Sequence, residues 1–226
     1  MTEPTQRDED VKGLVRQHWD DRAANFDDAS EHGIHSAEQH ERWLAVLREW
    51  VGEEPRRVLD VGCGTGVISL LLAELDHDVV GLDFAPEMLA QASAKVEQTD
   101  HSIPFCRGDA ETLPLRDESV DCVTARHLVW TLPGPRAALR EWARVLESGG
   151  RLVLLEGYWE HDEPWDEYVE MHDDLPMYDG RPADELASVL ADVGYTDVTH
   201  EPLNDPVLRG GDMGNDYYVI SGTVPN

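Results

Sequence analysis

Seven residues, Asp60 to Gly66 (DVGCGTG), form the clearest candidate for a ligand-binding loop. They join a short apolar run to a segment with helical periodicity. Glycine lacks a Cβ atom, so the backbone of such a loop can turn tightly and approach a ligand closely. The start of the following helix supplies unpaired N–H groups and the positive end of a dipole. The loop therefore predicts a nucleotide-like ligand, and several ligands of that kind would fit.

The spacing of the glycines narrows the choice. Counted from Gly62, the dinucleotide fingerprint needs glycine at the sixth position, where Val67 stands; Gly66 is fifth. The chain also lacks the G-x-x-x-x-G-K-[ST] loop that binds nucleoside triphosphates. Asp83 ends the next apolar run, where a carboxylate can accept hydrogen bonds from both hydroxyls of a ribose. The alternative for Asp83 is to cap the helix that starts near Pro86.

Apolar runs and helical periodicities alternate along the chain and place these residues at one edge of a sheet. Strands are predicted over 57–62, 78–83, 103–109, 119–125, 151–157, 195–203 and 216–223. Helices are predicted over 11–26, 36–51, 65–75, 86–96, 135–146 and 181–193, after a mobile acidic tail at 1–10. The alternation predicts an α/β fold with a doubly wound, seven-stranded, mostly parallel sheet. The last two strands predict an antiparallel hairpin at its edge.

Charge is the unusual part of the composition. The 226 residues include 18 Lys and Arg against 47 Asp and Glu, a net charge of −29, and 41% are apolar, enough for one sizeable core. This balance excludes a nucleic-acid binder with a generally basic surface and disfavours binding to anionic membranes. Only Lys12 and Lys95 are lysines. Such a composition is typical of proteins from salt-accumulating halophiles, in which molar salt screens the repulsion; the alternative is simply an acidic protein.

The cysteines and the N-terminus indicate the cellular compartment. The chain has three widely spaced cysteines, Cys63, Cys106 and Cys122. An odd number at such spacing predicts neither a disulfide framework nor a metal site, and we expect buried free thiols. The first residues contain no apolar signal segment, and no apolar run is long enough for a membrane span. The sequence predicts a cytoplasmic protein.

Five segments resemble class I S-adenosylmethionine-dependent methyltransferases, in order and at the family's spacing. They are VLDVGCGTG (58–66), GLDFAPEML (81–89), GDAETLPL (108–115), DCVTARHL (121–128) and RVLESGGRLVLLEG (144–157). They look closest to the small-molecule group that includes the ubiquinone and menaquinone C-methyltransferases. The resemblance implies a Rossmann-like methyltransferase fold, S-adenosylmethionine as cofactor, and methyl transfer to nitrogen, oxygen or carbon of a small molecule. It divides a single domain, 1–226, into a helical lid (1–52), a cofactor-binding core (53–157), an aromatic cap insertion (158–180), and a C-terminal helix with edge strands (181–226).

The resemblance also implies roles for individual residues. Along the cofactor, from its methionine part to its adenine, these are Asp60, Gly62, Gly64, Arg126 and His127, then Asp83 at the ribose, then Phe84, Met88, Asp109 and Ala110, with Gly66 starting the helix. A short segment, 18–27, resembles the family's N-terminal lid and implies that Trp19, Arg22 and Phe26 close over the cofactor; a plain amphipathic helix would give the same pattern. His127 is the leading general base for a protonated nucleophile, or else it only packs there. The other histidines near the expected cleft (His18, His32, His35 and His172) are expected to be solvated.

The segment 158–178 is the best indication of the acceptor. Its two Trp, three Tyr and two Met residues could bind a flat ring or a cationic amine, or form a homodimer contact. The acids between them (Glu160, Asp162, Glu163, Asp166, Glu167, Glu170, Asp173 and Asp174) are expected to be surface residues. Two alternatives stay open: a cofactor-binding protein without transfer activity, and a nucleotide-dependent oxidoreductase, which Val67 disfavours. A nucleic-acid acceptor is disfavoured, because no basic groove is evident and Arg126-His127-Leu128 stands where an Asn/Asp-Pro-Pro-Tyr motif would follow the fourth strand. Arsenic methylation is disfavoured, because Cys63 and Cys106 would have to leave their expected buried places.

Overall fold

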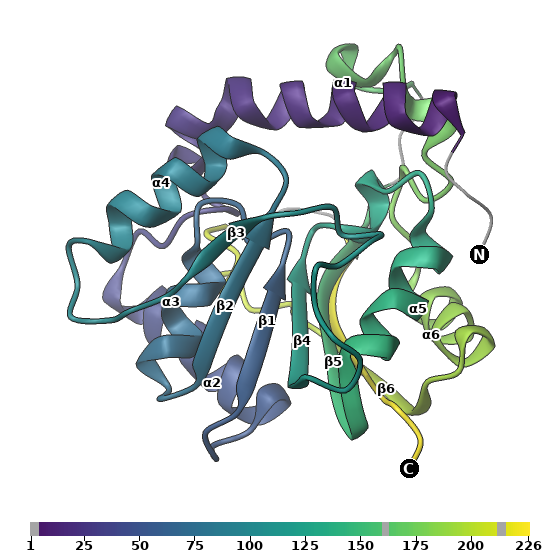
Figure 1. Ribbon diagram of the computed structural model, residues 1–226. Coiled ribbons are helices and arrows are strands. Elements are labelled where there is room, and N and C mark those ends of the chain that lie inside the picture. The colour runs from purple at the N-terminus through teal and green to yellow at the C-terminus, as the bar shows by residue number, and fades with distance from the viewer. Residues whose placement is uncertain (1–4, 160–162, 212–215) are drawn as a thin grey trace.

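The computed structural model describes residues 5–159, 163–211 and 216–226 (Figure 1). The predictions for residues 1–4 and for Glu160 and Asp162 fall outside these ranges. The α-helices are α1 (Gln6–Arg22), α2 (Ala37–Val51), α3 (Val67–Glu74), α4 (Pro86–Val96), α5 (Pro135–Val145) and α6 (Ala183–Val193). The strands are β1 (Arg57–Val61), β2 (Asp78–Asp83), β3 (Phe105–Arg107), β4 (Val120–Arg126), β5 (Leu146–Tyr158), β6 (Thr196–Pro202) and β7 (Asp216–Thr223). Short 3₁₀ helices cover Ala23–Asp28, Val129–Thr131, Asp166–Tyr168 and His172–Asp174.

All seven strands form one sheet in the order β3-β2-β1-β4-β5-β7-β6. Neighbouring strands from β3 to β5 are parallel, whereas β7 is antiparallel to both β5 and β6. The predicted doubly wound sheet and its antiparallel C-terminal edge are therefore confirmed. The strand order reverses between β1 and β4, which is where open α/β sheets bind their ligands.

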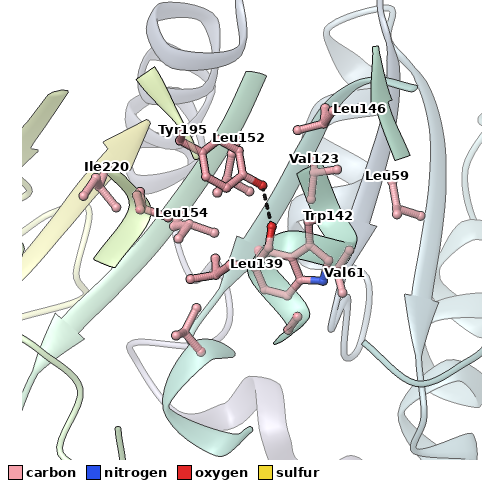
Figure 2. Close-up of a cluster of buried hydrophobic side chains, with 14 of the residues drawn as sticks. Leu59, Val61, Val123, Leu139, Trp142, Leu146, Leu152, Leu154, Tyr195 and Ile220 are labelled. Atoms are coloured by element: carbon pink, nitrogen blue, oxygen red, sulfur yellow. Dashed lines mark hydrogen bonds between the residues drawn. The ribbon is translucent and has the colours of Figure 1, made fainter. Parts of the chain in front are cut away.

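Helices cover both faces of the sheet. Because successive strand residues point to opposite faces, Val153 packs with α2 and α3, whereas Leu154 packs with α5 and α6. Figure 2 shows the second of these clusters, in which the fully buried Trp142 of α5 lies beside sheet residues. There the Tyr195 hydroxyl donates a hydrogen bond of 2.9 Å to the carbonyl oxygen of Leu139. These two apolar layers hold the strand ends in fixed positions.

Helix α1 crosses the end of the sheet toward which the arrows of β1 and β2 point (Figure 1). The prediction of a tail over 1–10 and a helix from residue 11 was wrong for residues 6–10, which are helical. Thr5 caps the helix, because its side chain accepts from the Asp8 N–H while the Asp8 carboxylate accepts from the Thr5 N–H. The α-helix ends at Arg22, and the chain continues as 3₁₀ helix to Asp28.

Three other boundaries differ from prediction, each for a local reason. The strand expected over 103–109 is limited to β3, because Asp109 turns the chain by accepting the Glu111 N–H at 2.8 Å. The helix expected from residue 65 starts at Val67, since Gly66 is its left-handed N-cap. The strand expected over 151–157 begins at Leu146, which pairs with Val120.

The segment 158–180 returns to the sheet after β5. The Trp159 N–H donates to the Asp179 carbonyl oxygen at 2.8 Å, which closes the described part of the insertion at its base. Tyr168 and Met171 are buried against Val11 and Val15 of α1. The insertion and α1 therefore form one roof above the carboxyl ends of the strands.

The three thiols lie away from solvent to different degrees. Cys63 and Cys122 are buried, as predicted, whereas Cys106 is only partly buried. Burial raises the pKa of the Cys63 thiol well above its usual value and that of Cys122 to about 12. All three are free thiols.

Candidate cofactor and acceptor site

A cavity of about 470 Å³ lies between the carboxyl ends of the strands and the roof. This volume is within the range of small-molecule sites. The predicted site residues that line it are Trp19, Arg22, Phe26, Asp60, Gly62, Gly64, Asp83, Phe84, Met88, Asp109, Ala110, Arg126 and His127. The structure thus brings together residues from five separate segments that the sequence analysis singled out.

The glycine loop packs so closely against its neighbours that two of its positions have no room for a side chain. Gly62 has a φ of +64°, and a Cβ atom there would come within 2.8 Å of the Leu128 side chain. Gly66 has a φ of +79°, and its Cβ atom would come within 3.0 Å of Ala92. These are conformations that residues with a side chain rarely adopt. The backbone itself therefore forms this wall of the cavity.

Asp83 braces the loop from the neighbouring strand. Its two carboxylate oxygens accept the N–H groups of Gly64 and Ala85, each at 2.9 Å. Ala85, not Asp83, is the N-cap residue of α4. A carboxylate has about four acceptor sites, so two remain for a ligand after these bonds. Burial raises the pKa of Asp83 although these backbone donors oppose that effect.

Asp60 lies at the floor of the cavity and is almost fully buried. It accepts hydrogen bonds from the hydroxyls of Ser69, at 2.5 Å, and Thr124, at 3.0 Å. Burial raises the pKa of Asp60 to about 6. The carboxylate therefore joins β1, α3 and β4 at the point where the strand order reverses.

Asp109 has a partner that the sequence analysis did not foresee. The ammonium group of Lys12, on α1, lies 2.7 Å from Asp109 and 2.8 Å from Glu111. Burial of Lys12 opposes its charge, but the two acidic partners raise its pKa overall. The carboxylate that the resemblance places at the adenine is thus tied to the roof helix.

Aromatic side chains line a second part of the cavity, under the roof. Trp130, in the 3₁₀ helix after β4, is the centre of this group, with ring centroids 5.3–6.2 Å from those of its neighbours. These neighbours are Trp19, Trp159, Trp165, Tyr168 and Tyr178. Edge-to-face and tilted pairs at such distances are favourable beyond their burial alone. The insertion therefore contributes to the cavity wall, as one of its predicted roles requires.

Histidines line the same region. His127 has a φ of +53°, a left-handed conformation, and its ring stacks on Tyr217 at 4.9 Å. Burial is the main cause that lowers its pKa well below the usual value, and the Arg126 charge adds to it. Within the described residues, its ring nitrogens make no hydrogen bond. His127 is therefore a neutral imidazole that a ligand could contact.

The prediction that His18 and His32 are solvated was wrong. His18 packs edge-on against Tyr168, with ring centroids 4.8 Å apart, and His32 stacks on Phe26 at 4.0 Å. Both line the cavity. Burial lowers the pKa of His32 to about 4 and also lowers that of His18. His35 is exposed, as expected.

The sequence analysis assigned no role to several further residues of the cavity, which include Lys12, Trp43, Trp130, Arg209 and Tyr217. They come from segments that carry no family motif or lie just beyond one. The buried, motif-adjacent position of Trp130 was the one signal that could have found it. No equivalent signal exists for Tyr217, which occupies an ordinary strand position.

Comparison with known proteins identifies the relationship behind this geometry. A family model described as a methyltransferase domain matches residues 59–154. The demethylmenaquinone methyltransferase of Renibacterium salmoninarum is 32% identical over 214 residues, which are 82% of this chain and 88% of that protein. The one from Deinococcus radiodurans is 43% identical over 114 residues, 50% of this chain and 47% of that protein.

Solved structures share the fold at lower identity. The [4+2]-cyclase SpnF has a TM-score of 0.70 and 21% identity, covering 93% of this chain and 96% of that one. A phosphoethanolamine N-methyltransferase of Haemonchus contortus, solved with S-adenosyl-L-methionine, has a TM-score of 0.66 and 17% identity over 96% of this chain and 57% of that one. Since the similarity to the Renibacterium enzyme extends over most of both chains, this chain belongs to the family of S-adenosylmethionine-dependent methyltransferases.

Proposed function

We propose that the chain transfers a methyl group to a small molecule with a flat ring, held in the aromatic part of the cavity. The observation that carries this proposal is the continuity of the cavity. It runs from the glycine loop and Asp83 to Trp130 and His127 without a dividing wall. One ligand at the loop and a second against the aromatic rings would thus share one cavity.

The cofactor end fits S-adenosylmethionine by its own chemistry. Gly64 leaves room for close approach, since a Cβ atom there would meet only Phe26, at 4.0 Å, and the Asp83 carboxylate keeps acceptor sites for the two ribose hydroxyls. Phe84 and Met88 supply apolar surface for the adenine ring. Asp109 and Ala110 lie at the remaining edge of the adenine in this assignment, and Asp60 and Arg126 at the methionine part.

When bound, the cofactor supplies a methyl group that its sulfonium activates. The chain's task is to hold the acceptor atom near that methyl group, and such positioning can remove roughly 7–11 kcal/mol from a barrier. The aromatic roof, with Trp19, Arg22 and Phe26 on its N-terminal side, would exclude water from the reacting atoms.

We assign the general base to His127. A neutral imidazole can accept the proton that a hydroxyl or an acidic ring carbon must lose, and the lowered pKa keeps this ring neutral at physiological pH. The name of the Renibacterium relative indicates a ring substrate, demethylmenaquinone, and the aromatic lining here suits a ring of that kind.

Transfer of a labelled methyl group tests this function. The protein would be incubated with [methyl-³H]S-adenosylmethionine and either 1,4-naphthoquinol or phosphoethanolamine. We expect label in the naphthoquinol product and none in phosphoethanolamine. Label in phosphoethanolamine alone would contradict the flat-ring acceptor. Tight binding of the cofactor without transfer to any acceptor would favour a protein that binds S-adenosylmethionine without catalysis.

We also propose a salt-rich cytoplasm as the setting. The net charge of −29 supports it, and among the described residues no helix is both long and apolar enough to cross a bilayer. The circular dichroism signal of the fold should be lost on dialysis into dilute buffer and kept in about 2 M KCl. Full stability in dilute buffer would overturn this setting. A homodimer, the remaining partner prediction, would be tested by light scattering in the same salt.

A further inference from the structure

We propose that Arg126, Arg209 and the hydroxyl of Tyr217 form a subsite for an anionic oxygen, carboxylate or phenolate, carried by the acceptor ring. The inference rests on the proposed function, because it names the group by which this cavity would recognise its acceptor. It concerns the corner of the cavity around His127 and Tyr217, which Arg126 connects to the end that holds Asp60.

Tyr217 is the centre of this corner. Its ring stacks against His127 at 4.9 Å with an angle of 16° between the planes, and the Arg209 guanidinium lies 5.8 Å from its centroid. Arg126 precedes His127 in the chain, and its guanidinium lies over Trp43 at 5.5 Å. All of these residues line the cavity. The general base and two cations therefore surround one phenol.

Two polar atoms in this corner lack partners. Among the described residues, nothing hydrogen-bonds to the Tyr217 hydroxyl or to Nη1 of Arg126, and both atoms are buried. The other terminal nitrogen of Arg126, Nη2, donates to the His32 carbonyl oxygen at 2.6 Å. Buried polar groups nearly always have a hydrogen-bond partner. Both atoms can donate to an oxygen acceptor, and the Arg126 charge acts on the Tyr217 hydroxyl, where it opposes the rise in pKa that burial causes.

The local charge also favours an anion. In a chain with a net charge of −29, two guanidiniums at one corner of a cavity are unusual. Of the carboxylates that line the cavity, Asp109 pairs with Lys12, Glu167 lies 3.3 Å from Arg22, and Asp216, next to Tyr217, is exposed. Glu31 accepts from the Ser30 hydroxyl. After burial, the Arg126 charge is the largest cause that lowers the pKa of His127, as expected in a positive field.

The same chemistry could serve a different group, the carboxylate of the cofactor's methionine part. The two sources give different results when the corner is changed. A subsite for the acceptor affects only acceptor affinity, whereas a subsite for the cofactor affects the affinity for S-adenosylhomocysteine.

Calorimetry with a matched pair of ring compounds separates them. Protein saturated with S-adenosylhomocysteine would be titrated with 2-naphthoate and with its neutral analogue 2-naphthamide. We expect naphthoate to bind about tenfold more tightly, as one desolvated charge-assisted contact would give. Arg209→Gln and Tyr217→Phe should each reduce this preference to about threefold or less. Both should leave the affinity for S-adenosylhomocysteine unchanged. Arg140→Gln, an exposed change on α5, is the matched control and should alter neither affinity.

Three results would overturn the subsite: equal affinities for the two probes, no binding of naphthoate at millimolar concentration, or weaker binding of S-adenosylhomocysteine in Arg209→Gln with the naphthoate preference intact. The last result would assign the corner to the cofactor. These titrations require no methyl transfer. An intact preference in a protein that transfers no label would therefore refute the proposed function and not the subsite.

Discussion

The two ends of the cavity are built in different ways. The proposed cofactor end consists of short, continuous segments at the ends of β1 and β2, where Asp83 holds the backbone of the glycine loop. The aromatic end is assembled from α1, the turn after β4, the 158–180 insertion and β7, which lie far apart in the sequence. Substitutions outside β1, β2 and the loops that follow them should therefore leave the first end intact. A substitution in any one of four segments can alter the second end.

We expect a substitution of Asp83 to have the largest effect of those considered, and to act on the cofactor end. Asp83→Ala should weaken the binding of S-adenosylhomocysteine about 100-fold, because it removes two charge-assisted hydrogen bonds of about 1.5 kcal/mol or more each. It should also lower the midpoint of chemical unfolding, since the Gly64 and Ala85 N–H groups lose their acceptor. Calorimetry and urea titration measure the two effects. Unchanged affinity in a folded variant would refute the ribose assignment.

Glu156, a buried residue of β5, holds the turn that follows β4. Its carboxylate accepts the Leu128 and Val129 N–H groups at 3.0 and 2.9 Å, which fixes the turn that carries Trp130. Burial without a nearby cation raises its pKa from 4.5 to about 7. Folding therefore favours the protonated acid, and the stability this gives is lost as the pH rises from about 4.5 through 7.

Glu156→Gln should consequently be more stable than the wild type at pH 8, by about 3 kcal/mol, and nearly equal to it at pH 4.5. The amide oxygen of glutamine can still accept both backbone N–H groups. Urea unfolding of both proteins at the two pH values measures this difference. Because other titrating groups are common to both proteins, a difference that does not change with pH would contradict the raised pKa.

A substitution of Trp159 tests whether the aromatic end binds its ligand independently of the cofactor end. Its ring lies 5.7 Å from that of Trp130 and 5.6 Å from that of His127. Trp159→Ala should weaken 2-naphthoate binding about tenfold, the loss expected for one aromatic contact and its burial, without changing the affinity for S-adenosylhomocysteine. Fluorescence titration is suited to this measurement. An equal loss for both ligands would mean that the two ends are not separate.

Lys12 should give the smallest effect, because it links the two ends through a partly exposed partner. Lys12→Met removes the ion pairs from α1 to Asp109 and Glu111 and should loosen the roof. We expect about threefold weaker binding of S-adenosylhomocysteine, with a faster dissociation rate in stopped-flow measurements. Lys12→Arg, which keeps the charge, is the control. Tighter binding in Lys12→Met would show instead that Lys12 competes with the cofactor for Asp109.

The sequence predicts the two ends of the cavity to different extents. The sheet, the glycine loop and Asp83 could be predicted because their signals are local: glycine spacing and apolar runs that end in acids. The start of α1 also has a local signal, since Thr5 and Asp8 have the spacing of a capping box. The roles of the individual cofactor residues remain proposals.

The aromatic end was less predictable because tertiary packing creates it. His32 has no motif around it, and only the fold brings Phe26 alongside its ring. Tyr217 becomes part of the cavity because β7 inserts between β5 and β6. The proposed lid, 1–52, also includes α2, whose residues Trp43 and Leu47 pack on the sheet. That packing favours a mobile lid limited to α1 and the 3₁₀ helix after it.

A crystal structure of the complex with S-adenosylhomocysteine tests the central claim most directly. We expect both ribose hydroxyls within hydrogen-bonding distance of the Asp83 carboxylate, with the sulfur atom facing His127 and the aromatic rings. A ligand bound outside the glycine loop, or one with its sulfur turned away from the aromatic end, would contradict a single cavity that joins cofactor and acceptor.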